Sequence, residues 1–550
     1  MSDRRPIDGL SHVIGASTPP LLDLTIPELL AQTAARLPDR EACVFPAQDI
    51  RWSYAEFARQ VDRLAAGLAS LGLEKGYRVG IWSPNRVEWL LTQFATARIG
   101  AILVCINPAY RQSELDYALN KVGCAALITA QSFKSSDYIA MIRALDPRPS
   151  TLRHLIAMGD PPEGFLGFDD ILSNDAPPEV AMDPHEPINI QYTSGTTGSP
   201  KGACLTHHNI VNNAYFTCAT MGFTEADRLC IPVPFYHCFG MVMGTLGCVA
   251  HGATMVVPGE GFEPEATLQA VHDERCTALY GVPTMFVAEM ALPSFDTFDL
   301  SHLRTGIMAG APCPRAIMER VQRDMNMTGV TIAYGMTETS PVSFQSGLDD
   351  PLDKRVGTVG QIHPHVEVKI VDESGATVPP GTQGELLTRG YSVMQGYWGE
   401  NAKTSDAIRD GWMHTGDLAT MDAEGYVQIT GRVKDMIVRG GENIYPREIE
   451  EFLFTHPDVA QAQVFGIPDD VYGEIVCAWL VLRDEASVSE SDVQAFCKGQ
   501  IAHYKLPAHV RFKDELPMTV TGKPQKFIMR DAMVAELANA RDKAQESLAK

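Results

Sequence analysis

The chain has 550 residues, 45% hydrophobic and 21% charged, a composition typical of a folded protein of roughly two to four domains. Its formal net charge of −23 argues against non-specific binding to nucleic acid or to anionic membrane surfaces, because most of the protein surface would be repelled by both. The twelve cysteines include no Cys-x-x-Cys pair, so we expect buried free thiols in a reducing compartment, the cytoplasm. The first thirty residues lack the apolar stretch of a signal peptide.

The first part of the chain alternates between helix and strand patterns. Thr25 with Glu28 and Ser53 with Glu56 have the capping-box spacing that marks a helix start. Further along we expect strands at 77–82, 101–106 and 125–129, with helices at 87–99 and 113–122 between them. Such alternation is typical of parallel sheets covered by helices.

Residues 229–259 contain no Asp, Glu, Lys or Arg, which could indicate a membrane span. Five glycines, three prolines and two histidines interrupt this stretch, however. We therefore expect a buried helix and strand that line a pocket, and no transmembrane segment.

The remaining patterns predict a second, smaller domain. Strands are expected at 253–257 and 305–308, and a β-rich unit with strands at 366–371, 384–388 and 426–430. After Gly431 the pattern becomes α+β, with Pro446 at a helix start and a terminal helix from Lys526. We predict an α/β protein with a large domain at 1–431, which has parallel-rich sheets, flanking helices and the β-rich subdomain, and a small α+β domain at 432–550.

The segment Thr193-Ser-Gly-Thr-Thr-Gly-Ser-Pro-Lys201-Gly202 is the most informative motif. It lies between a predicted strand and a predicted helix, where backbone N–H groups can converge on an anion. It is not a Walker A loop, since Pro200 precedes the lysine and no hydroxyl follows it. The alternative is a flexible polar surface loop. We predict that it binds the phosphates of ATP through Thr193, Ser194, Gly195, Thr196, Thr197, Gly198 and Lys201.

Four further motifs follow in order: Tyr334-Gly-Met-Thr-Glu-Thr339, Thr415-Gly-Asp417, Gly431-Arg-Val-Lys-Asp435 running into Arg439-Gly-Gly, and Thr521-Gly-Lys523. Together with the phosphate loop they resemble the adenylate-forming superfamily of acyl-CoA synthetases, luciferases and adenylation domains of peptide synthetases. The resemblance runs from about residue 26 to 526. Within the superfamily, residues 107–117 look most like fatty acyl-CoA synthetases, including the medium-chain branch.

The resemblance implies a role for each motif. Lys523 would bridge the substrate carboxylate and the α-phosphate, and Thr337 would contact the same phosphate. Glu338 would bind Mg²⁺, a hard ligand for a hard cation. The adenosine would contact Tyr334, Gly335, Gly310, Ala311 and Asp417, and Arg432 would hold the ribose or a phosphate. Lys434 would be the hinge of a mobile C-terminal domain, whose rotation brings Gly440 and Gly441 beside the pantetheine of coenzyme A. A solvated turn lysine, a helix cap and an ordinary core tyrosine are the competing readings of Lys523, Glu338 and Tyr334.

The resemblance also indicates where the acid binds. His237 falls near the expected acyl carbonyl, although a lone histidine is more often a core residue. Peptide-synthetase adenylation domains usually carry an Asp where this chain has Phe-Tyr-His, so an apolar acid fits better than an amino acid. No metal partners stand at useful spacing from His207 and His208 or from the pair at 363 and 365. The predicted pocket comprises Phe235, Tyr236, His237, Met241, Val242, Gly281 and Met336.

The sequence thus predicts a ligase that converts a medium- to long-chain fatty acid, ATP and coenzyme A into acyl-CoA, AMP and pyrophosphate. An aryl-CoA ligase, a luciferase-like oxygenase and a non-catalytic adenylate sensor are the alternatives. The expected partners are these small molecules only, with a homodimer left open.

Overall fold

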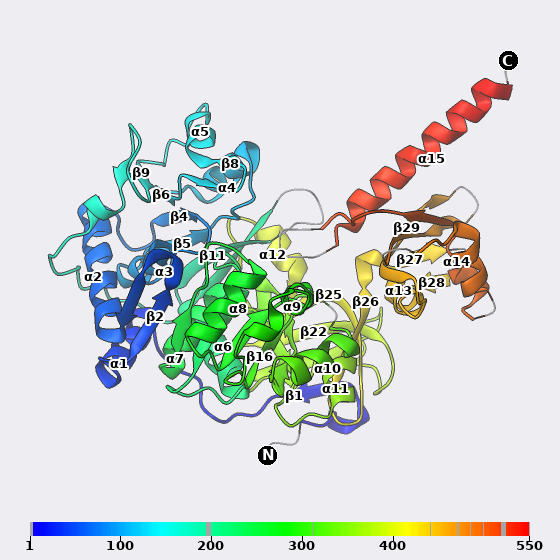
Figure 1. Ribbon diagram of the computed structural model, residues 1–550, viewed down its shortest axis with the longest axis horizontal. Helices are drawn as coiled ribbons and strands as arrows, with labels where there is room; N and C mark the ends of the chain where they lie inside the picture. Colours follow the sequence, from blue (N-terminus) through cyan, green and yellow to red (C-terminus); the bar gives the residue numbers. More distant parts are fainter. Residues whose placement is uncertain are drawn as a thin grey trace.

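The computed structural model describes residues 4–193, 200–311, 313–439, 442–469, 472–483, 486–498, 500–518 and 524–548. It consists of a large α/β unit, which includes a small β-rich sheet, followed by a compact α+β unit (Figure 1). The α/β class predicted from the sequence is confirmed.

One sheet of the large unit has the order β10-β9-β6-β4-β5-β11-β12-β23. Its strands from β10 to β11 are parallel, and β12 and β23 add antiparallel pairs at one edge. The strand bounds are β4 Arg78–Trp82, β5 Ile102–Cys105, β6 Ala126–Thr129, β9 His154–Ala157, β10 Leu166–Gly167, β11 Pro187–Thr193, β12 Lys201–Thr206 and β23 Gly396–Tyr397. The interleaved helices are α3 Val87–Arg98, α4 Gln112–Val122 and α5 Tyr138–Arg143.

A second sheet has the order β17-β16-β15-β13-β14-β2-β3 and is parallel except for the β2–β3 hairpin. Its strands are β2 Glu41–Phe45, β3 Ile50–Ser53, β13 Arg228–Cys230, β14 Thr254–Val256, β15 Ala278–Gly281, β16 Thr305–Met308 and β17 Gly329–Thr331. Helices α1 Ile26–Arg36 and α2 Tyr54–Ser70 begin at the predicted caps Thr25 and Ser53, whose side chains accept hydrogen bonds from the first turn. The remaining helices of this unit are α6 His207–Thr220, α7 Gly247–His251, α8 Pro264–Asp273, α9 Pro283–Met290, α10 Arg315–Asp324, α11 Leu352–Gly357 and α12 Asn401–Ala407.

The uncharged stretch is buried inside this unit. It forms a π-helix, η4 Phe239–Leu246, followed by α7 and β14, and every residue of η4 is buried. Within the part of the chain that the structure describes, no helix is both long enough and apolar enough to cross a bilayer.

The β-rich sheet has the order β1-β21-β22-β25-β24, with β26 also on β25. Its strands are β1 His12–Ile14, β21 Val366–Val371, β22 Gly384–Gly390, β24 Ile408–Arg409, β25 Trp412–Met421 and β26 Val427–Arg432. A three-stranded sheet beside it contains β18 Ala333–Gly335, β19 Val342–Gln345 and β20 Gln361–Ile362. Pairing of β26 with β25 continues to Arg432, one residue past the predicted domain boundary.

The C-terminal unit has the sheet order β28-β27-β30-β29, with β31 on β30, and its own apolar core. Its elements are β27 Ile437–Arg439, β28 Glu442–Ile444, α13 Pro446–Leu453, β29 Val459–Asp469, β30 Gly473–Leu482, α14 Glu490–Cys497, β31 His509–Phe512 and α15 Lys526–Leu548. Helix α15 packs its start, through Met529 and Met533, into a second apolar cluster that includes Phe465 and Trp479, and then extends away from the unit (Figure 1).

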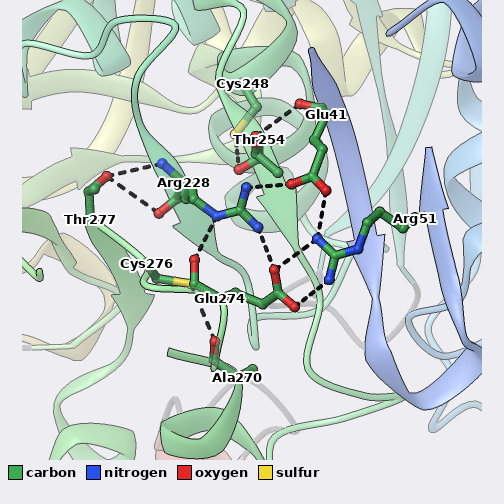
Figure 2. A network of polar contacts seen from close by, with 9 residues as sticks. All are labelled: Glu41, Arg51, Arg228, Cys248, Thr254, Ala270, Glu274, Cys276 and Thr277. Carbon is green, nitrogen blue, oxygen red and sulfur yellow. Dashed lines mark hydrogen bonds and ion pairs between the residues drawn. The ribbon is translucent and has the colours of Figure 1, made fainter. Parts of the chain in front are cut away.

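A network of ion pairs links several strands of the second sheet (Figure 2). Arg228, at the start of β13, contacts Glu41 at 2.6 Å and Glu274 at 2.5 Å. Arg51 of β3 bridges the same two carboxylates. The guanidinium groups therefore join three strands to the turn before β15.

Replacing Arg228 with Met should lower the midpoint of thermal unfolding by several degrees, corresponding to about 1–3 kcal/mol, because two partly buried carboxylates lose a partner. Scanning calorimetry at a fixed heating rate measures the shift. The control is Arg59→Ala, which breaks an exposed pair with Glu56 within α2 and should change stability by about 0–0.5 kcal/mol. Equal midpoints for both variants would contradict the structural role of the network.

Candidate active site

The predicted phosphate motif starts at the end of β11 and finishes at the start of β12, two strands that pair with each other. Thr193 is the last residue of β11 and pairs with Lys201, the first residue of β12. The structure therefore holds the two ends of the motif side by side. Residues Ser194, Gly195, Thr196, Thr197 and Gly198 lie outside the described residues.

Glu338 lies beside these two strands, in the short helix η6 Thr337–Thr339, and its side chain is buried. Its Oε1 accepts a hydrogen bond from the Tyr397 hydroxyl at 2.8 Å and one from the Thr193 hydroxyl at 3.4 Å. The Nζ atom of Lys201 stands 4.8 Å from the centre of the Tyr397 ring. The predicted residues Thr193, Lys201 and Glu338 thus converge around one tyrosine.

Tyr397 was not predicted as a site residue. It reaches Glu338 because β23 pairs with β12, which places Tyr397 opposite Ala203. Burial, followed by the nearby Glu338 carboxylate, raises the pKa of Tyr397 far above its usual value, so the hydroxyl remains a donor. Nothing in the local sequence Gly396-Tyr-Trp signals this contact, since it depends on strands almost 200 residues apart.

We expect Tyr397→Phe to lower kcat/KM for ATP in acid-dependent pyrophosphate exchange by about 5- to 30-fold, because Glu338 loses a hydrogen bond that orients it. Thioester formation from supplied acyl-adenylate should be retained. The matched control is Tyr391→Phe, which removes another buried hydroxyl, one that accepts from Asn213 at 3.4 Å. A comparable loss in both variants would indicate a general packing effect.

The residues predicted for the adenosine also come together. The Tyr334 hydroxyl donates to Asp417 Oδ2 at 2.5 Å, and Arg432 Nε lies 3.3 Å from Asp417 Oδ1. Burial and then the Asp417 charge raise the pKa of Tyr334, which keeps this hydroxyl protonated. Gly335 follows in β18, where a Cβ atom would lie 1.7 Å from the Pro341 carbonyl oxygen. Only glycine fits that approach.

Gly281 and Gly310 lie at the carboxyl ends of the neighbouring parallel strands β15 and β16. Gly281 pairs with Met308, and Gly310 follows two residues later with φ +87°. Gly310 and Ala311 are both exposed. The carboxyl edge of an open parallel sheet is the usual position of ligand sites in such folds.

The part of the predicted acid pocket at residues 235–242, called the acid wall below, is largely buried. Phe235 packs on Trp89 with ring centres 5.4 Å apart, and Met241 Sδ accepts from the Gln191 amide at 3.3 Å. The Tyr236 hydroxyl is buried without a hydrogen-bond partner among the described residues. Val242 is fully buried, whereas His237 and Met336 are half-buried.

This wall touches the turn that carries Glu338. The Cys238 thiol, next to His237, interacts with the Thr337 side chain, and burial raises the pKa of that thiol above its usual range. The structure thus brings the predicted acid wall and the predicted phosphate and metal residues into contact. An acid carbonyl beside His237 would be close to a nucleotide phosphate beside Thr337.

The predicted hinge, Lys434, is exposed in the turn η7 Val433–Asp435, directly after β26. Gly440, Gly441 and Lys523 lie outside the described residues. The residues that flank Lys523 on both sides are bonded to each other. Met518 forms a β-bridge with Pro524, and the Gln525 N–H donates to the Pro517 carbonyl at 2.9 Å. A cleft between the two units is lined by Thr284 of α9 and by Gln461, Asp514, Glu515, Leu516, Pro517, Met518 and Gln525.

Comparison with known proteins gives family matches over both units. The AMP-binding enzyme family matches residues 30–398, and the AMP-binding enzyme C-terminal domain matches residues 448–523. A putative acyl-CoA synthetase, YngI of Bacillus subtilis, is 49% identical over 94% of this chain and 98% of its own length. The mitochondrial medium-chain acyl-CoA ligase ACSF2 of Danio rerio is 44% identical over 96% of this chain and 91% of its own.

Solved structures agree with these matches. An anthranilate CoA ligase, AuaEII, in complex with anthranoyl-AMP superposes with a TM-score of 0.84 at 28% identity, covering 96% of this chain and all of that one. ATP-bound MatB from Rhodopseudomonas palustris superposes with a TM-score of 0.82 at 30% identity, covering 92% and 99%. With its five motifs in order and both units matched, the chain belongs to the AMP-binding enzyme family of adenylate-forming enzymes.

Proposed function

We propose that this enzyme converts an apolar carboxylic acid, ATP and coenzyme A into acyl-CoA, AMP and pyrophosphate through an acyl-adenylate. The observation that carries the proposal is the contact between the buried, uncharged wall at 235–242 and the turn holding Thr337 and Glu338. The relatives named as acyl-CoA synthetase and medium-chain acyl-CoA ligase support it.

In this proposal the nucleotide lies along the carboxyl edge of the sheets. Tyr334, with Gly335, Gly310 and Ala311, holds the adenine, while Asp417 and Arg432 hold the ribose. The 193–201 loop binds the phosphates. Glu338 is a suitable Mg²⁺ ligand, because its carboxylate is oriented by two hydroxyl donors beside the loop. A bound Mg²⁺ would supply positive charge to the phosphate oxygens.

The chemistry proceeds in two half-reactions. The acid carboxylate attacks the α-phosphorus and pyrophosphate leaves, with Lys523 offsetting the repulsion between the two anions. The coenzyme A thiol, giving up its proton, then attacks the acyl carbonyl, and AMP leaves. Rotation about Lys434 would withdraw Lys523 between the steps and bring Gly440 and Gly441 beside the pantetheine.

A medium-chain fatty acid is the substrate we favour. An amino acid would bury an ammonium group, and such a charge requires a carboxylate partner. The wall offers Phe235, Tyr236, Met241 and Val242, while His237 lies at its edge near the expected carbonyl. The twelve cysteines are all buried free thiols, which supports a reducing compartment, and we favour the cytoplasm.

A screen of pyrophosphate release tests the proposal, using straight-chain acids of graded length, aryl acids and amino acids, each with and without coenzyme A. We expect the highest kcat/KM with medium-chain acids and acyl-CoA formation only with coenzyme A. A preference for aryl acids would identify an aryl-CoA ligase, and oxygen uptake with luciferin would identify the oxygenase alternative. Absence of pyrophosphate release with every acid would leave only a nucleotide sensor.

A further inference from the structure

Three potential metal ligands meet at a surface away from the candidate active site. Ligand atoms of Asp23, His185 and His208 all lie within 4.8 Å of one another. The rings of His185 and His208 are 4.4 Å apart. Within the described ranges, no other group of three His, Cys, Asp or Glu side chains comes this close. Residue spacing in the sequence indicates no metal-binding partners for His208, because the other two ligands come from separate segments of the chain.

The Asp23 side of this cluster is held in place by an asparagine on α6. Asn212, one turn after His208, donates to the Leu22 carbonyl at 2.9 Å and accepts from the Leu22 N–H at 2.6 Å. Both backbone groups of the residue preceding Asp23 are therefore bound to the helix that carries His208.

The His185 side is held equally directly. The His208 N–H donates to the Pro184 carbonyl at 2.7 Å, which joins the residue before His185 to the start of α6. The His185 N–H donates to Asp183 Oδ1 at 2.8 Å. Since the fold already fixes the three backbones relative to one another, a bound ion would need to order only side chains.

We propose that Asp23, His185 and His208 bind one divalent transition-metal ion of the zinc class, with water completing the coordination. Two imidazoles and one carboxylate are ligands that Zn²⁺ accepts, whereas Ca²⁺ and Mg²⁺ prefer oxygen ligands throughout. All twelve cysteines are buried, so thiolates do not compete at the surface of the folded protein.

The position of the site gives the ion a structural role. His185 lies two residues before β11 and His208 two residues after β12, and the ends of these strands pair at Pro187 and Thr206. The cluster is therefore at the base of the β11–β12 pair, at the opposite end from Thr193 and Lys201. A metal ion here would join that base to the N-terminal segment, and binding to the folded state alone raises its stability.

The test uses the full chain without an affinity tag, stripped of metal with a chelator. Isothermal titration with Zn²⁺ should give one site that is lost, or weakened at least about tenfold, in His185→Ala, His208→Ala and Asp23→Asn. His503→Ala, which removes an exposed histidine of the C-terminal unit, should bind as the parent protein does. Zn²⁺ should also raise the unfolding midpoint of the parent protein, but not that of the cluster variants.

Co²⁺ provides an independent readout, since visible absorption bands of the bound ion should appear in the parent protein and in His503→Ala only. The metal-free variants should unfold at the parent midpoint, which separates lost ligands from lost folding. Binding that survives all three cluster substitutions would overturn the proposal. So would binding that disappears in Glu338→Gln, because the ion would then lie at the candidate active site.

Discussion

Replacing Lys523 with Ala is expected to lower acid-dependent pyrophosphate exchange by about 10²- to 10³-fold, the usual effect of removing one group that stabilises transition-state charge. Adenylation brings a carboxylate against a triphosphate, so the ammonium group matters most in that step. Thioester formation from supplied acyl-adenylate should continue, because Lys523 would have left the nucleotide by then. Measuring the two half-reactions separately gives the result.

The matched control is Lys526→Ala. This lysine stands three residues further along the chain, and its Nζ pairs with Glu450 at 2.7 Å within the C-terminal unit. Both half-reactions should stay near the parental rate in this variant. If Lys523→Ala slowed both half-reactions equally, a single arrangement of the two domains would serve both steps, and the hinge at Lys434 would have no role in the reaction.

The substitution Glu338→Gln is expected to reduce pyrophosphate exchange by about 100-fold or more and to raise the Mg²⁺ concentration needed for half-maximal rate. The amide keeps the shape of the side chain and removes the charge that a hard cation requires. A Mg²⁺ titration of the exchange rate at saturating ATP measures both effects. Tyr397→Phe should show the same direction with a smaller change, since it alters only the orientation of the carboxylate.

Glu367→Gln serves as the charge control for this experiment. Glu367 lies in β21 and pairs with His12 and Arg389. Strand β21 belongs to the β-rich sheet, whereas β11 and β12, which carry Thr193 and Lys201, belong to a different sheet. Its replacement should leave the Mg²⁺ dependence unchanged. An unchanged Mg²⁺ dependence in Glu338→Gln would contradict the assignment of the metal site.

Elements with strong local signals could be predicted closely. The helix expected at 87–99 is α3, and the strand expected at 305–308 is β16 with the same bounds. The capping boxes located the starts of α1 and α2, because the cap satisfies backbone donors within four residues. Strand β1 gave no such signal. It has three residues and exists because it pairs with β21, more than 350 positions away.

The candidate site shows the same contrast between residues with local sequence signals and contacts that depend on distant parts of the chain. Thr193, Lys201, Glu338 and Asp417 could be selected from motifs, because their residue types and order match a family pattern. The contacts between these residues could not be predicted from motifs, and Tyr397 was not predicted at all. One partner of Asp417 is the Tyr334 hydroxyl, and this contact crosses from the three-stranded sheet to the β-rich sheet.

The sequence by itself determined the class of fold, the order of the two domains and the family, and it predicted the kinds of residue that would bind ATP. These depend on local periodicity, caps and short motifs, which a linear chain displays directly. Only the tertiary structure decided that Tyr397 orients Glu338, that the uncharged wall touches the Thr337 turn, and that Asp23, His185 and His208 form one cluster. Each of these contacts joins strands, turns or helices far apart in sequence, and such pairings are set by packing of the whole core rather than by any residue's neighbours.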